Sequence, residues 1–235
     1  METEHGDSSR AMADYDIVII IPAHALCNTV VGDNGPTVLR IAMAKRILII
    51  LGHPDSRPER LCRALAETYH QGASEAGHEV KVVDVARLDF TALKSRLEWE
   101  GTVPETLREA QDAIRWAEHL VIIFPIWLGT MPALLKAFFE QVLRPGFAIE
   151  QTGPGRWQKL LSGRSARLVV TMGMPSFLYR WYFRAHGIRS FERNVLDFVG
   201  IGPIHETLIG MVEGRDAATR ERWLAKLAEL GKRGD

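Results

Sequence analysis

Two stretches of the chain are continuous apolar runs in which hydrophobic and polar residues do not alternate. They are residues 46–51 and 120–124. Runs of this length without alternation are typical of strands buried on both faces, as in the middle of a parallel sheet. Residues 80–85, 167–172 and 204–209 have strand character as well. The hydrophobic pattern therefore predicts five buried strands.

Helical periodicity fills the segments between these strands. We expect helices over residues 60–76 and 104–119, from Pro132 onward, over residues 190–199 and from Asp216 onward. Gly77 lies where a left-handed cap would end the first helix, and Ser190 has the character of a helix N-cap. Residues 86–103 and the glycine-rich residues 148–165 are expected to be connections, the second of them at the surface.

The helix that follows residues 120–124 is the most clearly amphipathic. Pro132 opens it, because its fixed φ angle and missing N–H cost nothing in the first turn. Its apolar face carries Leu135, Phe138, Phe139 and Val142, and its polar face carries Lys136, Glu140 and Arg144. We expect Glu140 and Arg144 to form an exposed i,i+4 ion pair.

Strands that alternate with helices predict an α/β fold, here a doubly wound parallel sheet with helices on both faces. In the strand order 2-1-3-4-5, the loops after the first, third and fourth strands meet at the carboxyl edge of the sheet. These loops are residues 52–59, 125–131 and 171–175. Open α/β sheets bind their ligands at such a point, so we expect the functional site there.

Composition excludes several classes of protein. The chain has 235 residues, a formal net charge of zero and no Lys/Arg cluster, which argues against a nucleic-acid partner or a polybasic membrane surface. No apolar run approaches the ~20 residues needed to span a bilayer. Cys27 and Cys62 form no disulfide framework and fit a reducing cytoplasm. No group of residues has the spacing of metal ligands, so we expect no metal.

The first 42 residues differ from the rest of the chain. They are rich in acidic residues and contain one short apolar run, residues 17–21, whose acidic leader argues against a signal peptide. Met43 reads as a fresh N-terminus directly before the first strand. We therefore expect an N-terminal extension over residues 1–42, poorly ordered, and one domain over residues 43–235.

The loop after the first strand has the chemistry of an anion site. It leads into a helix N-terminus, where free N–H groups and the helix dipole favour an anion such as a phosphate. The candidate ligands are His53, Ser56, Arg60 and the backbone N–H groups near Leu61 and Cys62. A histidine that only packs in the loop is the alternative for His53. The chain has no Walker loop, no G-x-G-x-x-G motif and no acidic pair after the first strand, which disfavours ATPases, dinucleotide Rossmann sites and receiver domains.

The segment FPIWLGTMPALLKAFFEQVL, residues 124–143, strongly resembles the second flavin loop and the following helix of the flavodoxin-like NAD(P)H:quinone oxidoreductases. The resemblance extends over about residues 44–215 and includes Gly52-His53-Pro54 and the segment 190–201. It implies a flavodoxin-like fold, a bound flavin (FMN or FAD), NAD(P)H as co-substrate and a homodimer with the site at its interface.

The same resemblance assigns residues to the flavin. It implies that the first loop holds the flavin phosphate and that the other two loops hold the ring. The implied ring residues are Pro125, Ile126, Trp127, Leu128, Gly129, Thr171, Met172, Gly173, Met174 and Tyr179. Leu128 departs from the family pattern, where many members have a second aromatic residue. Met172 and Met174 depart from it as well, and they remove a side-chain hydroxyl while leaving backbone donors.

Tyr179 and His186 lie where the family carries a Tyr/His pair beside the flavin. Reduction of a quinone creates an oxyanion, and a phenol and an imidazole can supply its proton. Aromatic packing for Tyr179 and a surface position for His186 are the alternatives. The neighbouring Trp181, Tyr182 and Phe183 are too many aromatic residues for an ordinary loop and indicate a substrate lid or a dimer face.

The resulting hypothesis is a flavin-dependent NAD(P)H dehydrogenase (quinone). In the reaction that the resemblance implies, hydride passes from NAD(P)H through flavin N5 to a quinone or a similar small-molecule acceptor. The alternative is a flavin-binding ancillary subunit, for example of a potassium-efflux system, that acts through a protein partner. An electron-carrying flavodoxin is disfavoured because such carriers are usually strongly acidic. FMN and FAD, and NADH and NADPH, are all compatible with these motifs.

Overall fold

The computed structural model describes residues 44–235. Residues 1–42, with the apolar run 17–21 and Cys27, lie outside the described residues. The described residues form one α/β unit, whose first strand starts at Arg46.

Five parallel strands form the central sheet. They are β1 (Arg46–Leu51), β2 (Glu79–Asp84), β3 (His119–Pro125), β6 (Ser165–Thr171) and β7 (Ile204–Ile209), in the order β2-β1-β3-β6-β7. Leaving aside the two strands of a separate hairpin, this is the predicted order 2-1-3-4-5. The predicted doubly wound α/β fold is therefore confirmed.

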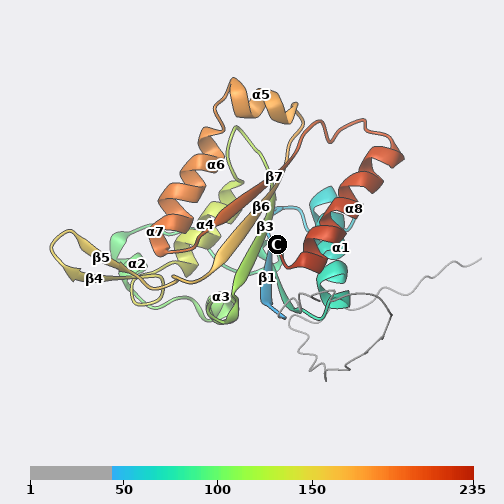
Figure 1. The fold of residues 1–235 in the computed structure, drawn as a ribbon. Helices are drawn as coiled ribbons and strands as arrows, with labels where there is room; N and C mark the ends of the chain where they lie inside the picture. Colours follow the sequence, from blue (N-terminus) through green and yellow to red (C-terminus); the bar gives the residue numbers. More distant parts are fainter. Residues whose placement is uncertain (1–43) are drawn as a thin grey trace, which may run out of the picture.

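Helices cover both faces of the sheet (Figure 1). The helices that cover the sheet are α1 (Leu61–Glu75), α3 (Arg108–Trp116), α4 (Ala133–Val142), α6 (His186–Phe191) and α8 (Ala217–Arg233). α1 and α8 pack together on one face, and α3, α4 and α6 cover the other. The last helix begins where the sequence predicts it, and Asp216 is its N-cap, since its carboxylate accepts a hydrogen bond from the N–H of Thr219 at 2.9 Å.

The double coverage explains the unbroken apolar runs. In β1, Ile47 and Ile49 lie in the apolar cluster with α1 and α8, while Leu48 and Ile50 lie in the cluster with α3 and α4. Successive side chains of a strand point to opposite faces. Because both faces are dry, every position of β1 after Arg46 is apolar and the sequence shows no alternation.

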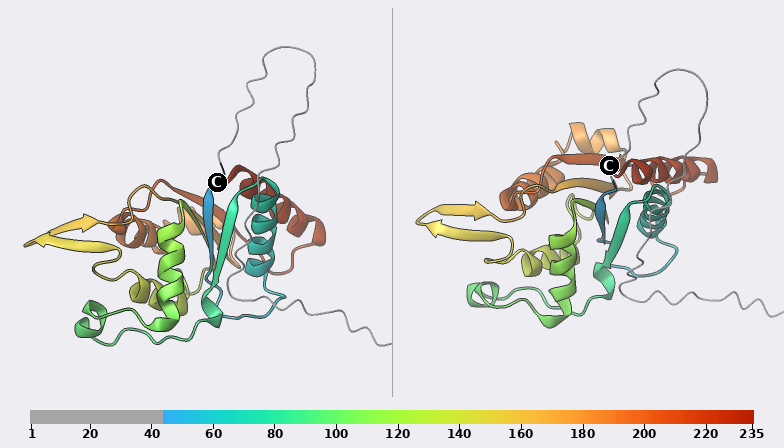
Figure 2. Two further views of the ribbon diagram at one scale, coloured as in Figure 1. Left: turned by 90° about the horizontal axis from the view of Figure 1, so that it is seen from below. Right: turned by 60° about the horizontal axis from the view of Figure 1, so that its bottom comes forward.

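The long connections contain structure that the sequence did not predict. The glycine-rich segment forms an antiparallel hairpin, β4 (Ile149–Gly153) and β5 (Arg156–Lys159), which projects away from the sheet (Figure 2). The connection after β2 contains η1 (Val85–Arg87) and α2 (Arg96–Glu100). The helix predicted from residue 104 starts as the 3-10 helix η2 (Glu105–Leu107) before α3. No helix among residues 44–235 is long and apolar enough to cross a membrane.

Two predictions about helix ends are wrong. Ser190 is not an N-cap, because it lies inside α6, which starts at His186. The chain then continues through the π-helix η3 (Glu192–Leu196) and α7 (Asp197–Val199). Arg184 and Ala185, directly before His186, have left-handed backbone conformations. The helix therefore starts at His186 without a capping side chain that the sequence could show.

Arg144 does not form the predicted exposed pair with Glu140. α4 ends at Val142, so Arg144 no longer follows the helical spacing. Its guanidinium is buried and donates hydrogen bonds to carbonyl oxygens, including those of Gln141 at 2.8 Å and Gly101 at 3.2 Å. Glu140 instead pairs with Lys136. Arg144 therefore ties the α2 connection to the end of α4.

Candidate functional site

The loops after β1, β3 and β6 meet at the carboxyl edge of the sheet. The N–H of Ile126 donates to the carbonyl of Thr171 at 2.7 Å, which joins the second and third loops. Cys62 Sγ lies 3.4 Å from Thr171 Oγ1, which joins the start of α1 to the third loop. The rings of His53 and Trp127 meet edge to face at 6.1 Å. The convergence that the strand order predicted is therefore present.

The first loop presents an uncapped helix N-terminus. Arg60 occupies the N-cap position of α1 with extended backbone angles, and no side chain caps the helix there. The first N–H groups of a helix have no partner within the helix, so those of Leu61 and Cys62 are available to a ligand. Ser56 is exposed in the same loop. The Cys62 thiol is buried, and burial raises its pKa to about 11. Cys62 therefore offers a ligand only its backbone N–H.

Arg60 carries less free charge than the sequence implied. Its guanidinium pairs with Asp55, which also pairs with Arg57 at 2.7 Å. The N–H of Arg57 donates to the same carboxylate, and this hydrogen bond is the main cause that lowers the pKa of Asp55. Asp55 therefore orders the loop and neutralises much of the charge that Arg60 would offer a phosphate.

His53 is held as a hydrogen-bond donor toward the site. Its Nδ1 accepts the N–H of Asp55 at 3.0 Å, so the proton of the neutral ring resides on Nε2. Partial burial lowers the pKa of His53, which favours this neutral form. A neutral imidazole with a free Nε2–H is suited to donate to a phosphate oxygen beside the α1 N-terminus.

The second loop is a tight turn with an exposed tip. Trp127 and Thr130 exchange two backbone hydrogen bonds, at 2.8 and 3.1 Å, and the residues between them, Leu128 and Gly129, both have positive φ angles. Leu128 pays about 1 kcal/mol for this left-handed conformation, and its side chain is fully exposed. Trp127 is half exposed beside it. Pro125, predicted in the loop, is the last residue of β3.

The third loop offers two free backbone donors. Met172 is buried, and its N–H donates to the carbonyl of Ile209 at 2.9 Å, so this amide is already used. The N–H groups of Gly173 and Met174 have no acceptor within residues 44–235. Thr171 ends β6 with its side chain turned toward Cys62. Of the donors that the resemblance implied, Gly173 and Met174 are therefore the ones left for a ligand.

Tyr179 connects three elements of the site. It lies on α5 (Ser176–Trp181), is buried, and donates its hydroxyl proton to the carbonyl of Gly129 at 2.9 Å. Burial is the main cause that raises the pKa of Tyr179, while the N–H groups of Ile188 and Gly187 at the start of α6 oppose the rise. The phenol is thereby fixed between α5, the second loop and α6.

His186 is exposed at the start of α6. Arg184 and Ala185 before it both have positive φ angles, 51° and 50°. The next residue, Gly187, packs so closely on the second loop that an added Cβ would lie 2.2 Å from the carbonyl oxygen of Gly129. The structure thus brings Tyr179 and the α6 start to the turn at Gly129, and leaves the His186 ring in solvent.

Sequence reasoning missed Asp55 and Gly187. Asp55 had a local signal, since an aspartate two residues before Arg57 and five before Arg60 can pair with both. Gly187 had a weaker signal. It is a glycine at the start of an apolar helical stretch, and the local pattern gives no reason for a glycine at that position.

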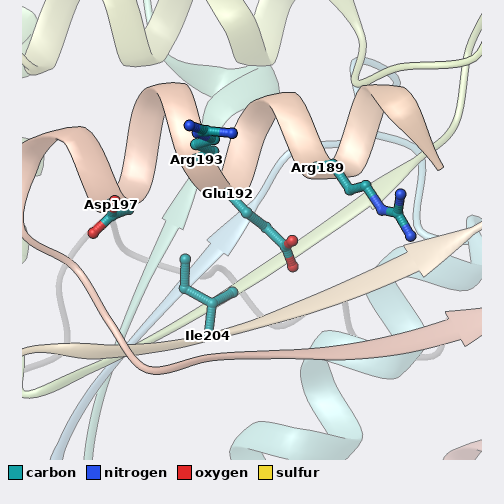
Figure 3. Close-up of a pocket in the computed structure, with 5 residues that line it drawn as sticks. All are labelled: Arg189, Glu192, Arg193, Asp197 and Ile204. Carbon is teal, nitrogen blue, oxygen red and sulfur yellow. The ribbon is translucent and has the colours of Figure 1, made fainter. Parts of the chain in front are cut away.

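A separate cavity lies between the η3–α7 segment and β7, away from the three loops. Figure 3 shows Glu192 extending from the helical segment toward the strand that carries Ile204. The carboxyl group of Glu192 lies close to that of Glu206, which pairs with Arg180 of α5. Burial first, and then the neighbouring Glu206 charge, raises the pKa of Glu192 to about 7.

This carboxyl pair predicts a pH-dependent stability. The folded state holds the Glu192 proton more tightly than the unfolded state, whose carboxyl titrates near the ordinary 4.5. The stabilisation is complete below that value and is lost as the pH rises through about 7. We therefore expect Glu192→Gln to raise the free energy of unfolding at pH 8 more than at pH 5, as measured by urea denaturation.

Glu109→Gln is the matched control, because Glu109 is exposed on α3 and has no ion pair within the described residues. Equal effects of Glu192→Gln at the two pH values would show that the two carboxyl groups do not share a proton.

Comparisons with known proteins show the family to which the chain belongs. A family model for the flavodoxin-like fold matches residues 45–230. An uncharacterised NAD(P)H oxidoreductase of Haemophilus influenzae is 31% identical over 187 residues, which cover 77% of this chain and 92% of the relative. The potassium-efflux ancillary protein KefG of Shigella dysenteriae is 28% identical over 160 residues, 63% of this chain and 71% of the relative.

Among solved structures, an NAD(P)H:quinone oxidoreductase from Methanothermobacter marburgensis has the same fold. It superposes with a TM-score of 0.69 at 24% sequence identity and covers 82% of this chain and 100% of its own. The chain therefore belongs to the flavodoxin-like NAD(P)H oxidoreductase family, as its resemblance implied.

Proposed function

We propose that this chain is a flavin-dependent oxidoreductase that takes a hydride from NAD(P)H and reduces a quinone-class acceptor by two electrons. The observation that carries the proposal is the convergence of an uncapped helix N-terminus, the exposed Trp127 turn and two free N–H groups at one edge of the sheet. The names of the Haemophilus influenzae and Methanothermobacter marburgensis relatives support the activity.

The residues present fit a flavin. Its phosphate would accept hydrogen bonds from the N–H groups of Leu61 and Cys62, from His53 Nε2 and from Ser56. Its ring would lie at the second and third loops, with Trp127 at one side. When bound, the flavin supplies the capacity to accept a hydride and to pass two electrons on, which no side chain has. FMN and FAD both contain the phosphate and the ring that these residues would bind.

The third loop would stabilise the reduced cofactor. Reduction of a flavin builds negative charge on the pyrimidine side of its ring, and preorganised N–H donors stabilise such charge effectively. The amides of Gly173 and Met174 are available for this purpose, whereas Met172 spends its amide on Ile209. The departure from the family pattern at Met172 and Met174 therefore leaves the backbone contribution in place.

Tyr179 and His186 would supply the proton that a reduced acceptor needs. Tyr179 is held with its hydroxyl at the Gly129 carbonyl, next to the turn that carries Trp127. His186 lies in solvent at the start of α6 and can exchange protons with water. To protonate an acceptor, the Tyr179 hydroxyl would turn away from the Gly129 carbonyl, and His186 would restore the proton from solvent.

The β4–β5 hairpin supports a homodimer. An isolated two-stranded hairpin is marginally stable in water, yet nearly all of its side chains are exposed, including Trp157. A second copy packed against the hairpin would cover them. We expect the purified protein to elute as a dimer in size-exclusion chromatography with light scattering. A monomer at micromolar concentration would contradict this assignment.

Turnover by the purified protein tests the proposal. We expect the flavin-loaded chain alone to oxidise NADH or NADPH with a water-soluble benzoquinone as acceptor. The similarity to KefG favours a second candidate, a flavin-binding subunit that acts through a partner. A protein that binds flavin but oxidises neither nicotinamide with any quinone would reject the enzyme and leave the subunit.

A further inference from the structure

The connection from β7 to α8 lies against the third loop of the candidate site. We define the β7–α8 loop as residues 210–216. The N–H of Met211 donates to the carbonyl of Met174 at 3.0 Å, and the N–H of Val212 donates to the carbonyl of Met172 at 3.2 Å. Both loops lie at the same end of the sheet (Figure 1). Backbone hydrogen bonds therefore hold the β7–α8 loop beside the loop that has the two free amides.

Gly210 allows the two loops to approach this closely. A Cβ at Gly210 would lie 2.4 Å from the backbone nitrogen of Ser176 and 2.8 Å from the carbonyl oxygen of Met174. The other end of the loop is fixed by Asp216, which caps α8 through the N–H of Thr219. Both ends of the β7–α8 loop are thereby held, which limits where the side chains between them can lie.

Glu213 in this loop places a carboxylate beside the third loop. Its Oε1 lies 3.7 Å from the position that a Cβ on Gly173 would have. Arg215, the nearest cation in the sequence, donates instead to the carbonyl oxygen of Met211 at 3.2 Å and to its sulfur at 2.9 Å. Within residues 44–235 Glu213 makes no ion pair. Its negative charge therefore lies, without a paired cation, next to one of the two free backbone donors.

We propose that Glu213 lowers the reduction potential of the bound flavin. The inference rests on the proposed function, in which the amides of Gly173 and Met174 face the side of the ring that gains negative charge. A carboxylate close to these amides repels the charge that they attract, and the repulsion acts mainly on the reduced form. Glu213 takes up no electrons itself, since both electrons arrive with the hydride of NAD(P)H.

The consequence of this charge concerns the class of acceptor. A flavin of lower potential is a stronger reductant. The reduced site can therefore pass electrons to acceptors of lower potential than a site with amide donors alone would serve. Glu213 is exposed, so solvent and salt screen its charge and its effect is moderate. No spacing in the sequence indicates this contact, because Glu213 and Gly173 lie on loops that follow different strands.

The midpoint potential of the flavin-loaded protein tests the inference. It is measured by stepwise reduction with dithionite beside a reference dye, which requires neither a nicotinamide nor a quinone. We expect Glu213→Gln to raise the potential by about 30 mV, which corresponds to a roughly tenfold tighter binding of reduced flavin relative to oxidised flavin. The difference between the variant and the wild type should shrink at high salt, because salt screens the exposed carboxylate.

Glu213→Asp and Glu109→Gln are the matched controls. Glu213→Asp keeps the charge and should retain most of the lowered potential. Glu109 is exposed on α3, which lies at the other end of the molecule from the third loop (Figure 1), so Glu109→Gln should leave the potential unchanged. The inference alone is overturned if Glu213→Gln has the potential of Glu109→Gln, or if Glu213→Asp shifts the potential as far as Glu213→Gln does. A protein that takes up no flavin would reject the proposed function, and this inference with it.

Discussion

Replacing Gly187 with alanine is expected to lower the free energy of unfolding by about 1–3 kcal/mol and to weaken flavin binding with it. An added Cβ would lie 2.2 Å from the carbonyl oxygen of Gly129 and 2.8 Å from Thr130 Cα. Both neighbours are backbone atoms of a tight turn and cannot move aside alone. The same carbonyl accepts the hydroxyl of Tyr179, so one methyl group disturbs α6, the second loop and α5 together.

Urea denaturation and flavin titration of the same samples measure this effect. Gly153→Ala in the hairpin is the control, because its Cβ would meet nothing within 4 Å and its φ angle is not positive. We expect that variant to match the wild type in flavin affinity. If Gly187→Ala behaves like Gly153→Ala, then α6 does not hold the second loop.

Tyr179→Phe and His186→Gln are expected to slow the reoxidation of the reduced protein by a quinone roughly a hundredfold, the usual loss when a general acid is removed. Reduction by NAD(P)H needs no proton at the acceptor, so its rate should change much less. Ferricyanide accepts single electrons without a proton from the site and should be insensitive to both substitutions. Stopped-flow absorbance separates the two half-reactions.

A structural role of Tyr179 must be distinguished from this chemical one. Loss of its hydrogen bond to Gly129 is expected to cost about 1 kcal/mol of stability, which urea denaturation measures independently. Tyr182→Phe is the control, since that tyrosine is exposed on the turn that follows α5. If both half-reactions slow together, Tyr179 and His186 position the flavin or the nicotinamide, and the proton donor lies elsewhere.

The sheet was predictable because its signal is local. A strand covered on both faces must be apolar at every position, and β1 and β3 carry that requirement in their own residues. Helix ends are different. α4 does not continue to Arg144, because the Arg144 guanidinium donates to carbonyl oxygens of the α2 connection. These oxygens belong to residues more than 40 positions earlier in the chain. Ser190 likewise looked like a cap because the left-handed turn before His186 leaves no side-chain signature.

The meeting of the three loops at the candidate site followed from topology, since the strand order places them at one edge of the sheet. The roles within it depend on contacts between loops. In the sequence Arg60 has the character of a free cation, but in the fold it pairs with Asp55. The backbone N–H of Met172 was a candidate donor to the ligand, but in the fold it donates to the carbonyl of Ile209. Asp55 is a near neighbour whose spacing allows this pairing without requiring it, whereas Ile209 lies on a strand far along the chain and no sequence spacing indicates its approach.

The carboxyl pair of Glu192 and Glu206 had no sequence signal at all. The two residues are 14 positions apart on a π-helix and an edge strand, and only the packing of the two elements makes their charges adjacent. The aromatic residues of α5 were visible as unusual in the sequence, but their exposure became apparent only in the fold.

Identification of the bound cofactor tests the central claim most directly. The full-length protein should be purified, any bound ligand released by heat, and the supernatant analysed by mass spectrometry. FMN and FAD should then be titrated into protein that has been freed of its ligand. The account predicts one non-covalent flavin per chain and a weaker affinity in a His53→Ala variant that stays folded. A colourless protein that gains no flavin absorbance and quenches no flavin fluorescence on titration would contradict it.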